Sequence, residues 1–168
     1  MKKSIFSLLF SLAIFSIACS QNPPASPRIT ADGANVSIAY GQPSKKGRVI
    51  FGAEGSQALE KYAKVWRTGA NDATVITFKK DGTFGGKAVK AGSYGLFTIP
   101  GEKEWVVILN SESKQWGAYS YKADKDVLRV TVPNVASKEV AEKLTFTVQD
   151  NAIHFMWDNA SFSVPVKF

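Results

Sequence analysis

Apolar residues recur at every second position in short runs along most of this chain, and this spacing limits the folds open to it. Val36, Ile38 and Tyr40 alternate with small or polar residues. The same period returns in later runs, at residues 74–78, 105–109, 144–148, 153–157 and 162–168. Because successive side chains of a strand point to opposite faces, this alternation predicts β-strands with one buried face. Residues 105–109 (WVVIL) are apolar throughout, which predicts a central strand covered on both faces.

Turn-forming pairs separate these runs at short intervals. The Asp-Gly pair at residues 81–82 is typical of a hairpin turn. The Asp-Asn pairs at residues 150–151 and 158–159 predict a C-terminal meander of three strands. Short strands with frequent turns favour a single all-β domain over residues 28–168, mainly antiparallel and built as a β-sandwich or jelly roll.

Two short segments depart from the strand pattern and are expected to be helical. In residues 56–64, Ala58, Leu59 and Tyr62 are spaced so that they would share one face of a helix. Residues 135–141 are expected to form a second, shorter helical turn. The predicted fold is therefore a β-sandwich with one or two short helices.

The N-terminal segment has the pattern of an export signal. Lys2 and Lys3 precede an apolar run, residues 5–18, that is too short to span a bilayer and fits a signal peptide covering residues 1–18. A small residue stands directly before Cys19, as in a lipobox, so acyl chains are expected on this cysteine. Residues 19–27 are rich in proline and small polar residues and predict a tether.

Cysteine usage agrees with lipid attachment. Cys19 is the only cysteine of the chain, so no disulfide can form within it, and a lipid on its thiol is expected to leave no disulfide-linked partner. Several acyl chains on Cys19 would hold the protein firmly on a membrane. The expected location is the bacterial cell envelope, with the outer membrane favoured and the leaflet left open.

Composition narrows the partners and cofactors. The net charge of +7 falls to +5 without Lys2 and Lys3, and the longest basic runs are pairs of lysines. This scatter argues against nucleic acid as a partner and leaves acidic glycans or lipid headgroups open. With one histidine, His154, and one cysteine that carries lipid, no metal site and no cofactor are expected.

Several motifs in matching order resemble the domain of unknown function 2911 family. They include residues 40–52 (YGQPSKKGRVIFG), 65–74 (VWRTGANDAT) and 91–100 (AGSYGLFTIP), followed by Trp116-Gly117 and residues 126–129 (DVLR). The resemblance covers nearly the whole chain after the predicted signal peptide. It implies a secreted or lipid-anchored bacterial protein with a mostly β fold, and it implies no activity, substrate or cofactor.

Residues 66–72 (WRTGAND) concentrate side chains suited to ligand binding. Trp66 can stack on a flat ligand face, Arg67 and Asn71 can donate hydrogen bonds, and Asp72 closes the segment. Further candidates for the same pocket share aromatic or anion-seeking side chains: Arg48, Trp116, Tyr119 and Arg129. The structural alternative makes the tryptophans core residues, with Arg67 paired to a carboxylate such as Asp72 or Asp126 and Asn71 closing an Asx turn.

Two functions of different classes follow. The first is a lipid-anchored binding or accessory module for a glycan or a small anionic ligand, because catalytic residue types are sparse and sandwich loops commonly carry binding surfaces. The second is a hydrolase of envelope or dietary polymers that uses carboxylates such as Glu54, Asp72 or Asp126 as acid and base. No catalytic residue stands out for the second.

Overall fold

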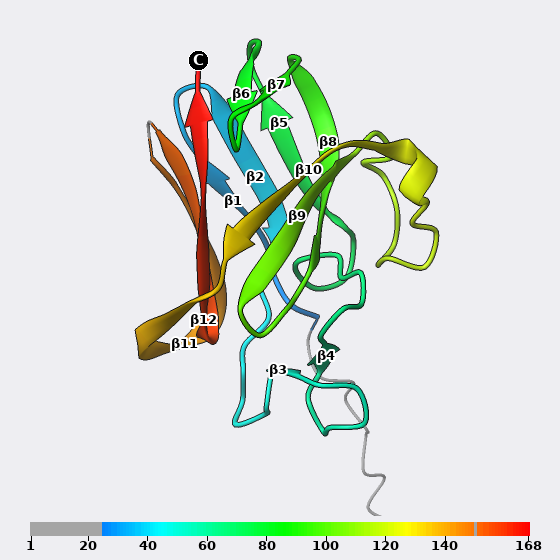
Figure 1. Cartoon of the computed structure of the whole chain (residues 1–168), viewed down its shortest axis with the longest axis vertical. Coiled ribbons are helices and arrows are strands. Elements are labelled where there is room, and N and C mark those ends of the chain that lie inside the picture. Colours follow the sequence, from blue (N-terminus) through cyan, green and yellow to red (C-terminus); the bar gives the residue numbers. More distant parts are fainter. Residues whose placement is uncertain (1–24, 150) are drawn as a thin grey trace, which may run out of the picture.

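The computed structural model describes residues 25–149 and 151–168 (Figure 1). The predicted signal peptide, the predicted lipidation site at Cys19 and residues 20–24 of the predicted tether lie outside the described residues. Within the described part the chain consists mainly of strands, so the predicted all-β class is confirmed. Among these residues no helix is long and apolar enough to cross a membrane.

Twelve strands and one 3-10 helix make up the described chain. The strands are β1 (Arg28–Asp32), β2 (Val36–Gly41), β3 (Phe51–Gly52), β4 (Glu60–Lys61), β5 (Thr74–Phe78), β6 (Gly82–Phe84), β7 (Lys87–Val89), β8 (Gly92–Ile99), β9 (Glu104–Asn110), β10 (Asp126–Pro133), β11 (Val135–Gln149) and β12 (Ala152–Lys167). The helix is η1 (Ala123–Lys125).

Two antiparallel sheets form the sandwich. The larger has six strands in the order β1-β2-β5-β8-β9-β10, and the smaller has four in the order β11-β12-β6-β7. The parallel pair β3-β4 stands apart from both. Figure 1 shows β3 and β4 at the lower end of the molecule, which we call the basal end, and the C-terminus at the opposite end.

The alternating side chains fill the space between the two sheets. On β2, Val36, Ile38 and Tyr40 are buried, as their spacing predicted. On β12, Phe155 and Trp157 face them from the smaller sheet and belong to the same core. Each such side chain contributes about 1.5–3 kcal/mol on burial, so the core stabilises the sandwich mainly through apolar area.

A second, smaller apolar cluster lies on the other face of the larger sheet. Ala73, Phe97 and Ile108 are buried there, with Ala118 and Tyr121 packed against them. Strand β9 is therefore covered on both faces at Ile108, which confirms the prediction for residues 105–109. The residues that cover it come from the connection between β9 and η1.

The helix predicted at residues 56–64 is wrong. The backbone N–H groups of Leu59, Glu60 and Tyr62 donate to carbonyls of residues 49, 50 and 52 instead of to carbonyls four positions earlier. Ala63 adopts a φ of 61°, which an α-helix does not tolerate. Pairing with β3 has therefore overridden the helical spacing of the apolar residues.

Two predictions near the C-terminus are also wrong. Residues 135–141 are not helical but start the long strand β11. The predicted turn at residues 158–159 is a bend inside β12, where Asp158 has a φ of 56° and the pairing with β11 shifts register. The expected three-stranded meander is thus a two-stranded hairpin, because an Asp in the left-handed region can bend a strand without ending it.

Candidate functional site

Trp66 opens the WRTGAND segment and points into the core. Its backbone exchanges two hydrogen bonds with Thr98 on β8, of 2.8 and 2.9 Å. Its indole is 2% exposed, stacks on Trp157 at 5.8 Å between ring centroids and meets Phe51 edge-on. Trp66 is therefore a core residue, as the structural alternative predicted. Its ring packs between the two sheets and offers no exposed face to a ligand.

The rest of the segment is held rigidly behind Trp66. Thr68 is fully buried and has a φ of 54°, and its hydroxyl bonds to that of Thr98 at 3.1 Å. The hydroxyl of Thr74 donates to the Thr68 carbonyl at 2.9 Å. A Cβ atom on Gly41 would clash with the Ala70 carbonyl, so the close approach of this segment to β2 requires glycine there.

Glu60 is a partly buried carboxyl near Arg67 that the sequence did not single out as part of the site. Burial raises the pKa of Glu60 from 4.5 to about 7, although the charges of Arg67 and Arg48 pull it down. The Nε atom of Arg67 is buried without a hydrogen-bond partner among the described residues. Among the described residues, Arg67 therefore makes no ion pair with Asp72 or Asp126, which the structural alternative expected, and its charge acts on Glu60 instead.

Arg48 lies on the connection between β2 and β3, where its charge acts on Glu60 together with that of Arg67. Its guanidinium donates to the carbonyls of Ser44 and Lys45, at 2.6 and 3.0 Å, within its own turn. These bonds shape the turn and leave the side chain exposed at the basal end.

Asn71 and Asp72 meet the second predicted cluster. The Asn71 carbonyl accepts a hydrogen bond from the Gly117 N–H at 3.0 Å, and Asp72 forms an isolated bridge with Trp116. The side chain of Asn71 donates to the carbonyl of Ser26 at 3.0 Å, in place of the expected Asx turn. Two of the predicted site segments are thus brought together, as the binding hypothesis required.

The connection from β9 to η1, residues 111–122, presents two aromatic side chains to solvent. We call it the aromatic loop. Trp116 is 62% exposed and Tyr119 is 86% exposed, while Ala118 and Tyr121 of the same loop pack on the smaller apolar cluster. Ala118 and Tyr121 therefore anchor the loop on the sheet, while the rings of Trp116 and Tyr119 are exposed to solvent.

Two shallow hollows flank Trp116. The larger encloses about 490 Å³ and is lined by charged, polar and aromatic side chains: Glu112, Lys114, Gln115, Trp116, Tyr119, Ser120, Lys122 and Lys125. The second encloses about 420 Å³ and is bordered by Arg28, Asp72 and Trp116. Because three lysines face one glutamate in the larger hollow, its charge favours an anionic ligand.

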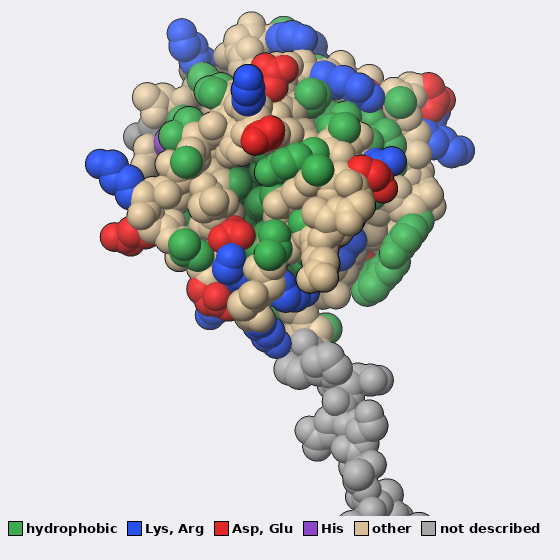
Figure 2. Space-filling model, turned by 60° about the horizontal axis from the view of Figure 1, so that its bottom comes forward, with side chains coloured by type: hydrophobic (Ala, Val, Ile, Leu, Met, Phe, Trp, Pro, Cys, Tyr) green, Lys and Arg blue, Asp and Glu red, His purple; other side chains and the backbone are tan. Residues whose placement is uncertain are grey.

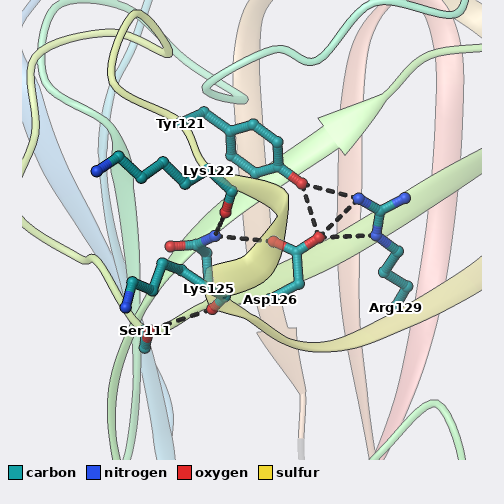
Figure 3. Close-up of polar contacts among 7 residues, drawn as sticks. Ser111, Tyr121, Lys122, Lys125, Asp126 and Arg129 are labelled. Carbon is teal, nitrogen blue, oxygen red and sulfur yellow. Dashed lines mark hydrogen bonds and ion pairs between the residues drawn. The ribbon is translucent and has the colours of Figure 1, made fainter.

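A polar clamp fixes the far end of the aromatic loop to β10 (Figure 3). Asp126 accepts hydrogen bonds from Asn110 at 2.8 Å, from the Tyr121 hydroxyl at 2.7 Å and from Arg129 Nε at 2.7 Å. Burial and the bond to Asp126 raise the pKa of Tyr121 to about 12. The bond to Asp126 also raises the pKa of Arg129, and the Arg129 guanidinium donates to the Tyr121 hydroxyl at 3.0 Å, so its side-chain hydrogen bonds belong to this clamp.

The carboxylates suggested for hydrolysis lie in different surroundings. Asp126 is engaged by its three donors, and Glu54 forms an exposed ion pair with Lys64 at 3.2 Å. Asp72 lies exposed beside Trp116. Within residues 25–149 and 151–168, no three His, Cys, Asp or Glu side chains group closely enough to hold a metal ion. Burial raises the pKa of a further carboxyl, Glu60, to about 7.

Fold and site together define a β-sandwich protein with an exposed aromatic, lysine-lined loop on one of its sheets. The chain belongs to the family described as Protein of unknown function (DUF2911), which matches residues 22–166. This confirms the family resemblance of its motifs. No curated protein and no solved structure matches the chain.

Proposed function

We propose that the protein is a lipid-anchored binding module of the bacterial cell envelope that holds an acidic glycan on its aromatic loop. The observation that carries the binding role is the exposure of Trp116 and Tyr119 beside a hollow of about 490 Å³ with three lysines on its wall. An amphipathic ring such as indole can stack on the apolar face of a sugar while its surroundings supply hydrogen bonds. The export signal and Cys19 support the location.

The ligand chemistry follows from the side chains around the two rings. Lys114, Lys122 and Lys125 attract carboxylate or sulfate groups, and Glu112 provides one acceptor for a sugar hydroxyl. Such a shallow, solvated site is suited to a repeating polymer that gains strength from several adjacent sugars. An acidic oligosaccharide fits both the stacking rings and the positive charge better than a neutral one.

Tryptophan fluorescence provides a direct test. Three of the four tryptophans are at most 2% exposed, so collisional quenching by acrylamide reports mainly on Trp116. We expect oligogalacturonate to protect this fluorescence and to raise the melting temperature progressively as its concentration exceeds its dissociation constant. A neutral malto-oligosaccharide of equal length should protect it less, and Trp116→Ala should weaken binding of the acidic probe about tenfold.

The control variant is Tyr62→Ala, which removes a partly exposed aromatic ring from the basal end. It should leave binding of the acidic probe unchanged. Equal loss of binding in both variants, or no protection of Trp116 by either oligosaccharide, would contradict the binding role. Release of shortened sugars from the acidic probe would instead favour the hydrolase alternative.

Lipid attachment has its own test. Intact mass measurement of the membrane-extracted protein should give a chain that starts at Cys19 and carries acyl chains, and Cys19→Ser should release the protein from the membrane fraction. A wild-type chain found without lipid would remove the anchor from the proposal and leave the binding role standing.

A further inference from the structure

The connection between β2 and β5 forms an exposed basic surface at the basal end. Residues 43–64, which we call the basal segment, contain five basic side chains and two acidic ones, Glu54 and Glu60. Lys45 is paired with Asp158 at 2.6 Å and Lys64 with Glu54 at 3.2 Å. These two ion pairs engage the carboxylates of Asp158 and Glu54. The three basic side chains outside the pairs, Lys46, Arg48 and Lys61, give the segment its positive excess.

Those three basic side chains make no ion pair with a carboxylate among the described residues, although the charge of Arg48 acts on the partly buried Glu60. Arg48 and Lys61 donate only to backbone carbonyls of their own segment. Lys46 is exposed. Its backbone N–H donates to the Glu142 carboxylate, whereas its ammonium group does not bond to that carboxylate. The positive charge of this surface is thus available to an outside partner.

Two apolar side chains are exposed within the same surface. Val49 is 59% exposed and Leu59 is 44% exposed. They lie on adjacent stretches of backbone, because the Leu59 N–H donates to the Val49 carbonyl at 3.0 Å. Adjacent aliphatic side chains bordered by cations are the combination that favours the interface of a lipid bilayer.

The basal segment also lies where the described chain begins. The Gln42 N–H, directly before the segment, donates to the carbonyl of Pro27 at 2.8 Å. Figure 2 brings the basal end forward and shows Lys and Arg side chains gathered beside the start of the described chain. Residues 19–27 could span at most about 30 Å when fully extended. A lipid on Cys19 would therefore keep this end of the sandwich close to a bilayer.

We propose that the basal segment docks on anionic lipid headgroups, with Lys46, Arg48 and Lys61 over the phosphates and with Val49 and Leu59 inserted between them. This inference rests on the lipid anchor proposed above. A short tether raises the local concentration of lipid at the basal end, so weak individual contacts suffice to orient the domain. Docked in this way, the sandwich is oriented with its basal end against the bilayer and the end that carries the C-terminus away from it.

Vesicle binding tests the docking without the anchor. A chain of residues 25–168 retains every core residue and lacks Cys19. We expect it to co-sediment with vesicles of phosphatidylglycerol and phosphatidylcholine at low salt, and to bind pure phosphatidylcholine vesicles at least tenfold more weakly. Salt at 0.5 M should release it, because screening weakens contacts with phosphate groups.

Substitutions locate the surface. Lys46→Gln with Arg48→Gln should lower binding to the anionic vesicles about tenfold. Because Arg48 shapes its turn, the single change Lys46→Glu alters the charge by the same two units at a side chain without that role and should weaken binding as well. The matched control, Lys80→Gln with Lys167→Gln, removes two charges near the opposite end and should bind as wild type.

The outcomes separate this inference from the anchor. Binding of residues 25–168 equally to neutral and anionic vesicles, an equal loss in the control pair, or no binding at low salt would overturn the docking surface. Self-association of the chain that Val49→Ser abolishes would assign the surface to a second copy instead. None of these results depends on whether Cys19 carries lipid, which the mass measurement decides.

Discussion

Two loops of similar composition have opposite orientations in this molecule. The WRTGAND segment directs Trp66 into the core, where it is 2% exposed, whereas the aromatic loop leaves Trp116 62% exposed. Both loops combine an indole with glycine, alanine and polar residues. They differ in where they lie on the fold. Trp66 packs into the main core between the two sheets, whereas Trp116 lies over a sheet face that other residues of its loop already cover.

The difference teaches how each loop is stabilised. The inward loop is held by apolar burial and by the buried threonines 68, 74 and 98. The outward loop has only a small apolar cluster below it and depends on the polar clamp around Asp126. We therefore expect substitutions in the first to act on stability and substitutions at the tip of the second to act on binding.

Trp66→Ala should have the largest effect. Truncating a buried tryptophan removes packing against Trp157 and Phe51 and should lower the free energy of unfolding by about 3–5 kcal/mol. Trp116→Ala, the matched change in the other loop, should alter it by no more than about 0.5 kcal/mol. Urea unfolding curves of the two variants measure the contrast, and equal destabilisation would remove it.

Glu60→Gln should have the next largest effect, and only at higher pH. Since the folded pKa of about 7 lies above the value of 4.5, the contribution of Glu60 to stability is fully present below pH 4.5 and is lost as the pH rises to 7. The loss amounts to about 3 kcal/mol at most. The glutamine variant lacks this titration, so its stability relative to wild type should increase between pH 5 and pH 8.

Thermal unfolding of both proteins across this pH range checks the prediction. Asp81→Asn offers a contrast, because hydrogen bonds from Lys90 and Ala91 lower the pKa of Asp81. Its stabilising contribution is present above the unfolded pKa and is lost in acid, which is the reverse dependence. A constant difference between Glu60→Gln and wild type over the whole range would show that Glu60 does not titrate near neutrality.

Tyr121→Phe should have a smaller effect on stability than Trp66→Ala or Glu60→Gln. It removes the hydroxyl that donates to Asp126 at 2.7 Å and should cost about 1.5 kcal/mol, as expected for a hydrogen bond to a charged group. Because the ring still packs on Phe97, the aromatic loop should loosen without unfolding the sandwich. Faster amide hydrogen exchange in residues 111–122, with little change in β2 or β12, would report this loosening.

The sequence predicted the sandwich and its core positions because alternation is a local signal. Ile38, Phe155 and Trp157 are buried as their spacing required. It wrongly predicted a helix at residues 56–64. Leu59 and Glu60 pair there with residues 49 and 50, and no local pattern encodes these contacts. Nor did it show that Asp158 bends a strand without breaking it.

The candidate site was predictable in its parts but not in its arrangement. Trp116 and Asp72 are neighbours, as the hypothesis of a shared pocket required, yet Trp66, Arg48 and Arg129 belong elsewhere. Residue type alone does not say which of two indoles faces water. Glu60 was missed because its shifted pKa arises from burial, which only the folded chain creates.

The entry of the chain into β1 has a mechanical consequence. Five residue pairs join β1 to β2, from Arg28 opposite Gly41 to Asp32 opposite Ser37. Their hydrogen bonds run across the strands, so a pull on the N-terminal side along β1 loads them in shear and together, instead of peeling them one at a time. A domain tethered through this end would resist tension as a unit, with Asn71 adding its bond to Ser26.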